Sequence, residues 1–183
     1  TYLIDAISNT SHLKIFVFTL LLGGWVGIVS KSGGFRGLVE SISRFIKNRV
    51  WAQIATLISG MVVFFDDYIN CMVVGTTLRP LTDKFKISRE RLSYIVDSTA
   101  APVAVFFIIS TWIGYQLGII SIVTGQEEKA YEYFLLAIPF NFYSFFCIGF
   151  IVLSTFMKRE FGSMRRAEAR AIEKGELYNP ASG

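Results

Sequence analysis

The sequence predicts an all-α membrane protein whose helices cross the bilayer several times, and three features carry this prediction. Hydrophobic residues make up 52% of the 183 residues, charged residues make up 17%, and the mean hydropathy is +0.49. The apolar residues gather in four long runs, and basic clusters at residues 31–49, 79–91 and 158–174 directly flank these runs. A water-soluble domain of this length cannot bury so much apolar surface, so we exclude a soluble enzyme and a disordered chain.

The three basic clusters predict which ends of the runs face the cytoplasm. They hold five, five and six of the 18 Lys and Arg residues. Basic residues gathered beside apolar segments are typical of cytoplasmic loops, whereas a nucleic-acid surface interleaves them with exposed polar and aromatic side chains. We therefore expect a lipid bilayer as a partner and no nucleic acid.

The first two apolar runs predict one span and one hairpin. A span is expected near residues 14–31, where 16 uncharged residues separate Lys14 from Lys31. The second run, residues 50–78, is too short for two crossings, which need about 40 apolar residues. Because both its flanks are basic, we expect both flanks on the cytoplasmic side, which makes residues 50–78 a re-entrant hairpin with its tip inside the membrane.

The third and fourth runs predict two further spans. The third span is expected near residues 92–124, after a helix start at Ser88 and a break at residues 97–102 that ends in Pro102. An acidic loop at residues 126–128 follows on the outer side, and a fourth span near residues 133–157, bent at Pro139, returns inward. Residues 1–157 then form the membrane segment, and residues 158–183 form a cytoplasmic tail or loop.

Three carboxylates fall at membrane depth: Asp66, Asp67 and Asp97. Each costs roughly 2.5 to 3.5 kcal/mol at the centre of a membrane helix, so their presence requires an explanation. No Lys or Arg lies inside any of the apolar runs, and a buried ion pair would have to use a cation from a loop edge, such as Arg79 or Arg91. We therefore interpret the expected counter-charge as a mobile cation.

The residues around these carboxylates suit a hard cation. Beside Asp66 and Asp67, further oxygen donors come from Asn70, Thr76 and Thr77, and no cluster of His or Cys suits zinc or copper. Neighbouring residues on a helix point about 100° apart, so the two aspartates can share a site only where the hairpin tip is unwound. Sodium is the natural candidate, with Asp66, Asp67 and Asp97 as its charged ligands.

The break at residues 97–102 supplies a second set of donors. Pro102 lacks an N–H, which frees the carbonyl of Ser98, and the side chains of Asp97, Ser98 and Thr99 add oxygens at the same place. Two broken elements would then face each other across one polar site. The alternative is a plain proline kink capped by Ser98 and Thr99.

Adjacent carboxylates in a low dielectric suggest ion exchange. Two ionised groups repel each other and are both desolvated, so each favours a proton when no cation is bound. A sodium ion reverses this preference and expels the proton. Competition of this kind gives antiport if the sodium-loaded and protonated forms reorient and the bare dianion does not, which is an assumption.

Three segments carry a resemblance to a known family: FTLLLGGWVGIVSKSGG, FFDDYINCMVVGTTLRPLTDKFKISRERLSYIVDSTAAPV and KREFGSMRRAEARA. Together they resemble the NhaC-type sodium/proton antiporters of the ion transporter superfamily. The resemblance implies a multi-pass transporter of the bacterial inner membrane, at least twice as long as this chain and built from two inverted repeats. This chain, which starts at Thr1 without a leader pattern, would be an internal fragment holding one repeat. By position, the site residues implied are Asp66, Asp67, Asn70, Thr76, Asp97, Ser98 and Thr99.

Other functions remain open from the sequence. A sodium- or proton-coupled exchanger of a small organic solute, such as malate and lactate, would use Thr76 and Thr77 or a hairpin N-terminus to bind the substrate carboxylate. An intramembrane aspartyl protease would pair Asp67 with Asp97, but the Tyr-Asp and Gly-x-Gly-Asp signatures are absent. A structural membrane subunit is the last alternative.

The antiporter interpretation also fixes the expected partners. We expect sodium and protons as transported ions, no resident cofactor and no enzymatic activity. The rest of the same polypeptide, with a second repeat, would complete the site, and a second copy of the protein is a candidate partner.

Overall fold

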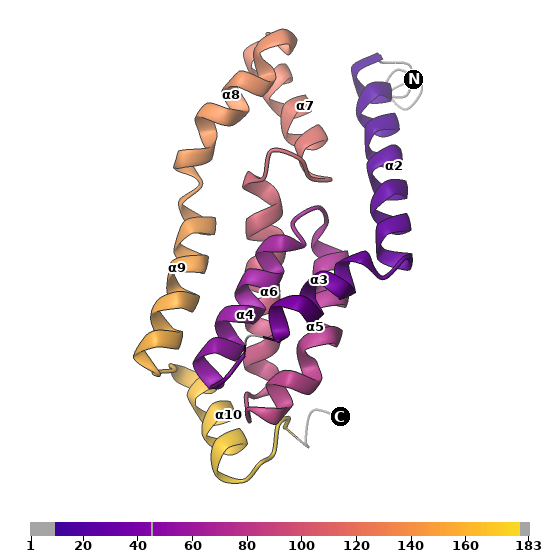
Figure 1. Ribbon diagram of the computed structural model, residues 1–183. Helices are drawn as coiled ribbons and strands as arrows, with labels where there is room; N and C mark the ends of the chain where they lie inside the picture. The colour runs from indigo at the N-terminus through magenta and orange to yellow at the C-terminus, as the bar shows by residue number, and fades with distance from the viewer. Residues whose placement is uncertain (1–9, 45, 180–183) are drawn as a thin grey trace.

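The computed structural model describes residues 10–44 and 46–179, and within these ranges the chain is helical without any strand (Figure 1). This confirms the all-α prediction for the described residues. Residues 1–9 of the predicted membrane segment and residues 180–183 of the predicted tail lie outside them. The α-helices are α2 (Thr10–Lys31), α3 (Gly34–Ser43), α4 (Arg49–Val62), α5 (Asp67–Lys84), α6 (Arg89–Phe106), α7 (Ile113–Thr124), α8 (Ala130–Ala137), α9 (Phe142–Met157) and α10 (Gly162–Glu173), with short 3-10 helices at Glu127–Lys129 and Ile138–Phe140.

Helix α6 forms the centre of the bundle. It packs against α4, α5 and α9, and α4 and α5 pack against each other as the two arms of a helical hairpin. Helices α7 and α8 lie at one end of the molecule, and α10 lies at the opposite end, where it contacts α6 (Figure 1). Helix α2 contacts α3 and α7. For convenience, the end of the hairpin at residues 63–66 is called the tip, and the end near α10 is called the base.

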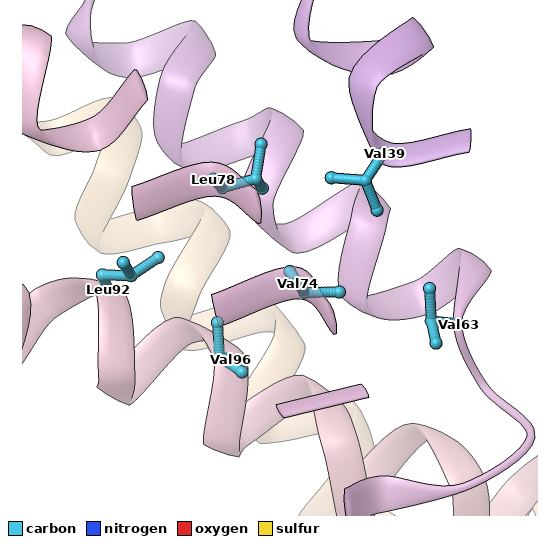
Figure 2. Packing of buried hydrophobic residues seen from close by; sticks show 6 residues of the cluster. All are labelled: Val39, Val63, Val74, Leu78, Leu92 and Val96. Carbon is cyan, nitrogen blue, oxygen red and sulfur yellow. The ribbon is translucent and has the colours of Figure 1, made fainter. Parts of the chain in front are cut away.

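Two apolar clusters hold the bundle together. The first joins α3, α4, α5 and α6 through six buried side chains: Val39, Val63, Val74, Leu78, Leu92 and Val96 (Figure 2). The second joins α4, α6 and α9 through Leu57, Ile95 and Ile151. These clusters fix both hairpin arms against α6, so the tip has a defined position.

Polar caps set where the central helices begin. The side chain of Asn48 accepts a hydrogen bond from the backbone N–H of Trp51 at the start of α4, and Ser88 accepts one from Arg91 at the start of α6. Each cap satisfies an N–H group that lacks a partner in the first turn of a helix. The predicted helix start at Ser88 is confirmed.

The helix break predicted beside Asp66 and Asp67 is present, because α4 ends at Val62 and α5 begins at Asp67. The second arm of the hairpin is longer than predicted: α5 continues through Pro80 to Lys84 instead of ending near residue 78. A proline removes one hydrogen bond, and the packing of α5 against α3, α4 and α6 compensates for that loss. Re-entrance of this hairpin into a membrane stays a prediction.

The break predicted at residues 97–102 is wrong in position. Helix α6 is continuous from Arg89 to Phe106 with Pro102 inside it, and the chain leaves the helix at residues 107–112 instead. Pro102, Val103 and Ala104 are buried, and packing against the neighbouring helices keeps α6 helical through its missing hydrogen bond. The predicted third span therefore consists of two helices, α6 and α7.

Within the described residues, no helix by itself has both the length and the hydropathy of a membrane span. The segments Glu127–Phe140 and Phe142–Met157 meet the criteria together across a bend of 40°. This bend lies beside Pro139, where the sequence predicts it.

Candidate cation site at the hairpin tip

The tip brings opposite ends of two helices together. Helix α4 ends there with its C-terminal carbonyl groups, and α5 begins there with free N–H groups. The side chain of Asp66 caps α5, because its Oδ1 atom accepts a hydrogen bond of 3.0 Å from the N–H of Ile69. Asp67 follows as the first residue of α5, and both carboxylates are half-buried. The positive end of the α5 dipole favours these anions, while the negative end of α4 favours a cation.

Asn70 ties the two arms of the hairpin together. Its Nδ2 atom donates hydrogen bonds to the carbonyl oxygens of Gly60, at 2.6 Å, and of Val63, at 3.0 Å. The side chain is fully buried, and its Oδ1 atom has no hydrogen-bond partner among the described residues. Asn70 therefore presents a carbonyl oxygen at the tip that the neighbouring helices leave unsatisfied.

The second break in the chain lies against the tip. In the segment of residues 107–112, the N–H of Thr111 donates to the carbonyl of Phe65 at 3.0 Å, and the hydroxyl of Thr111 donates to Oδ2 of Asp66 at 3.3 Å. The rings of Phe64 and Phe107 stack with their centroids 4.0 Å apart. Two broken elements thus meet as the sequence suggests, but the second is residues 107–112 and not residues 97–102.

The residues predicted at 97–102 lie on continuous helix and have separate surroundings. Thr99 is buried and donates to the carbonyls of Ile95 and Val96 in its own helix. Its side chain lies directly against Gly60 of α4, where an added Cβ atom would come within 2.8 Å of the Thr99 Cβ. Thr99 thus packs against α4 and bonds within its own helix, which agrees better with the alternative in which its hydroxyl has only a structural role. Ser98 beside it is also buried.

Asp97 is exposed on α6. Asp66, Asp67 and Asp97 all act electrostatically on Cys71, one turn into α5. In the part of the chain that the structure describes, however, no three Asp, Glu, His or Cys side chains are arranged to hold a metal ion together. A cation at the tip would therefore take most of its ligands from amide, hydroxyl and carbonyl oxygens.

Thr76 and Thr77 are not brought to the tip. They lie about 14 Å along α5 from Asp67, given a rise of about 1.5 Å per residue. Thr76 is exposed, and its hydroxyl donates to the carbonyl of Met72 in its own helix at 2.6 Å. The structure therefore groups Asp66, Asp67 and Asn70, with Asp97 nearby, and leaves Thr76 and Thr77 apart.

The tip carboxylates have no basic partner in the described residues. The ion pairs found there are Arg36–Glu40, Arg49–Glu168, Arg89–Asp83, Arg91–Glu160 and Arg170–Glu90. None of them includes Asp66, Asp67 or Asp97. The buried-ion-pair alternative, with Arg79 or Arg91 as the cation, is thus not formed among these residues.

Comparison with known families decides the identity of the chain. The sequence model of the Na+/H+ antiporter family matches residues 10–107 and 103–182. The chain belongs to the Na+/H+ antiporter family. This is a family of membrane proteins, in agreement with the apolar composition of the chain.

An uncharacterized protein of Haemophilus influenzae is 34% identical to this antiporter-family chain over 170 residues. The match covers 91% of this chain and 33% of the relative, so the chain spans about a third of the length of that protein. No solved structure matches the chain.

Three residues near the tip of this antiporter-family chain were missed by the sequence reasoning: Ser59, Ser110 and Thr111. The hydroxyls of Ser59 and Ser110 are buried without a hydrogen-bond partner in the described residues, and Thr111 contacts Asp66. The available signal was a Ser-Thr pair inside the uncharged run of residues 103–124, which also contains Gln116, Ser121 and Thr124. Without a proline or glycine beside it, that pair does not indicate a break in the helix.

Proposed function

We propose that the protein to which this chain belongs exchanges sodium for protons across a membrane, and that Asp66 and Asp67 are the groups for which the two ions compete. The observation that carries this proposal is the acidic tip, which lies among packed helices without a basic partner in the described residues. Membership in the Na+/H+ antiporter family supports a transporter over an enzyme.

The tip suits a competition between sodium and a proton. A bare carboxylate in a low-dielectric site needs either a proton or a cation to neutralise it. A cation is further favoured by the C-terminal end of α4, and Asp97 on α6 adds a third carboxylate nearby. Binding of sodium would expel the proton, which couples the two ions.

The proposal also covers the architecture of the transporter and its location in the cell. The chain is proposed to form one inverted repeat of an NhaC-type protein in the bacterial inner membrane, with α4 and α5 as a re-entrant hairpin. The proposal is supported by the basic flanks of the hairpin and by the break at its tip. The second repeat would come from further sequence of the kind present in the longer Haemophilus influenzae relative, of which this chain spans about a third. Exchange of a carboxylate solute is less well supported, because the hydroxyl of Thr76 bonds to its own helix.

Replacement of the tip carboxylates tests the proposal. We expect Asp66→Asn and Asp67→Asn, made in the complete protein, to abolish sodium-dependent dequenching of a pH dye in everted vesicles. Asparagine also caps helices, so Asp66→Asn keeps the start of α5 and leaves the fold intact. The matched control is Asp83→Asn, which changes a carboxylate of the same helix at the base, where it pairs with Arg89. Wild-type exchange in both tip variants would refute the proposed role of the carboxylates.

A further inference from the structure

Three fully buried oxygen atoms near the tip lack a partner in the described residues: Oγ of Ser59 in α4 and two others, which belong to the two breaks in the chain. One of these two is Oδ1 of Asn70 in the first turn of α5, and the other is Oγ of Ser110 in the segment of residues 107–112. Ser110 is covalently joined to Thr111, whose N–H and hydroxyl contact Phe65 and Asp66 at the tip. Both oxygens therefore belong to the region where the two breaks meet.

Leaving such atoms unsatisfied has a cost. A buried polar atom without a partner costs about 1 to 3 kcal/mol, and native proteins contain few of them. The amide of Asn70 cannot relieve this by turning over, because its nitrogen donates to the carbonyls of Gly60 and Val63. Two carbonyl acceptors fix which end of the amide is nitrogen, so the acceptor end must remain Oδ1.

The chemistry of these atoms points to a cation. An amide oxygen is a pure acceptor, and a serine oxygen can offer a lone pair while its hydrogen turns elsewhere. Hard cations take oxygen ligands of this kind, together with carboxylates and backbone carbonyls. A site with few carboxylates and several neutral oxygens suits a single positive charge.

We infer that Ser110 and Asn70 are the neutral ligands of the transported cation and complete a site whose charged ligand is Asp66. Thr111 is a positioning residue in this arrangement, because its two hydrogen bonds hold the segment of residues 107–112 against the tip. The inference rests on the proposed function, and it assigns residues 107–112 a direct part in binding. The alternative is a buried water molecule that satisfies both oxygens.

Direct binding of sodium to the purified complete protein tests the inference. We expect Ser110→Ala to lower the affinity for radioactive sodium about tenfold, as expected for the loss of one ligand contact. Ser110→Cys keeps the side-chain volume but offers sulfur, which hard cations bind poorly, and should weaken sodium binding in the same way.

A matched control separates ligand loss from the loss of any buried hydroxyl. Ser144 of α9 is buried, and its hydroxyl is satisfied by Oδ1 of Asn141 at 3.1 Å. Ser144→Ala should bind sodium with wild-type affinity. Thermal unfolding gives a second measurement: sodium should raise the unfolding temperature of the wild type and raise that of Ser110→Ala less. In sodium-free buffer Ser110→Ala should unfold at the wild-type temperature or above it, because the lost hydroxyl had no partner.

The outcomes separate this inference from the proposed function. Wild-type sodium affinity in Ser110→Ala and Ser110→Cys, with exchange abolished in Asp66→Asn, overturns the inference and keeps the function; a buried water would give this result. Equal loss of affinity in Ser144→Ala also overturns it. Wild-type exchange in Asp66→Asn alone overturns the inference, because Asp66 is its charged ligand. Wild-type exchange in Asp67→Asn as well removes the proposed function. If Ser110→Ala fails to fold, the isosteric Ser110→Cys decides.

Discussion

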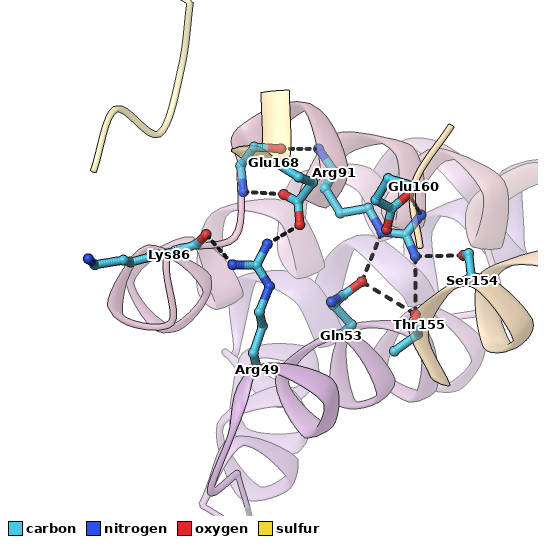
Figure 3. A network of polar contacts seen from close by, with 9 residues as sticks. Arg49, Gln53, Lys86, Arg91, Ser154, Thr155, Glu160 and Glu168 are labelled. Atoms are coloured by element: carbon cyan, nitrogen blue, oxygen red, sulfur yellow. Dashed lines mark hydrogen bonds and ion pairs between the residues drawn. The ribbon is translucent and has the colours of Figure 1, made fainter. Parts of the chain in front are cut away.

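The base of the bundle holds a buried charge and the tip holds two half-buried charges, and only the charge at the base has partners of opposite charge in the described residues. At the base, the guanidinium of Arg91 is 1% exposed and is surrounded by partners from three other segments (Figure 3). It donates to Gln53 at 2.9 Å, to Glu160 at 3.2 Å, and to the hydroxyls of Ser154 and Thr155 at 2.8 and 3.1 Å. The most buried charge of the described chain is thus also fully partnered.

A second carboxylate extends this network to α10. Glu168 forms an ion pair with Arg49 of α4, and it accepts a hydrogen bond of 2.7 Å from the backbone N–H of Ser88 at the start of α6 (Figure 3). Arg49 also donates to the carbonyl of Lys86 at 2.8 Å. The network therefore connects α4, α6, α9 and α10 to one another at the base.

The tip shows the reverse arrangement. Its carboxylates have no basic partner, and three of its buried side-chain oxygens, those of Ser59, Asn70 and Ser110, have no partner at all in the described residues. Burial of a charge is therefore a poor guide to function in this fold. The more informative observation is whether the chain itself supplies the opposite charge. It does so at the base, and we propose that an ion does so at the tip.

The largest effect expected from this contrast is on stability at the base. Arg91→Met should lower the free energy of unfolding by about 3 to 5 kcal/mol, because it leaves the Glu160 carboxylate buried without its partner. Arg36→Ala removes an exposed pair with Glu40 and should change stability by less than about 1 kcal/mol. Thermal unfolding of the complete protein in detergent measures both. An Arg91→Met variant as stable as Arg36→Ala would show that the polar network at the base does not stabilise the fold.

The next largest effect concerns the packing that holds the tip in place. An alanine at Gly60 would put a Cβ atom 2.8 Å from the Cβ of Thr99 and closer still to its Oγ1 atom. We expect Gly60→Ala to lower the free energy of unfolding by about 1 to 3 kcal/mol, through the overpacking of α4 against α6.

A second substitution and a matched control sharpen this prediction. Thr99→Ala removes the nearest atom, so the double variant should be less destabilised than the sum of the two single variants. Gly75→Ala in α5 is the control, because its added Cβ would meet no atom within 4 Å beyond its chain neighbours and the backbone of its own helix. Additive effects of Gly60→Ala and Thr99→Ala would contradict a direct contact between the two positions.

The fold was predictable where the chain carries a local signal. The break beside Asp66 and Asp67 and the bend beside Pro139 follow from charge and from proline chemistry, which act within one turn of helix. The break at residues 107–112 has no such signal, because these six residues include no proline, glycine or charged residue. It depends on tertiary contacts with the tip, which the sequence does not display.

The candidate site was predictable to a similar extent. Asp66, Asp67 and Asn70 stand out as polar residues in an apolar run, and the structure groups them. Thr76 and Thr77 stand out in the same way, but their distance along α5 keeps them away. Ser110 was missed because a serine in an apolar helix is ordinarily satisfied by its own backbone. Arg91 was treated as a loop-edge cation, since nothing in the sequence shows that Gln53, Ser154 and Thr155 converge on it.

The smallest effect concerns the pH dependence of the base. Burial raises the pKa of Glu160 above its ordinary value of 4.5, although the charge of Arg91 acts in the opposite direction. The folded protein therefore holds this proton more tightly than the unfolded chain does. The stability that Glu160 contributes is complete below pH 4.5 and is lost as the pH rises through the raised pKa.

Substitution by glutamine isolates this contribution. Glu160→Gln keeps an oxygen that can accept from Nη1 of Arg91, and it stays neutral at every pH. We expect the stability of Glu160→Gln relative to the wild type to rise by less than about 1 kcal/mol between pH 4.5 and pH 8, because only the wild type loses the proton that its folded state holds more tightly. Glu173→Gln, at an exposed position of α10, is the control. If Glu160→Gln instead lowered the free energy of unfolding by several kcal/mol at pH 8, the charge on Glu160 would be a net stabiliser. The ion pair with Arg91 would then contribute more to stability than the hydrogen bonds from Arg91 to its neutral partners do.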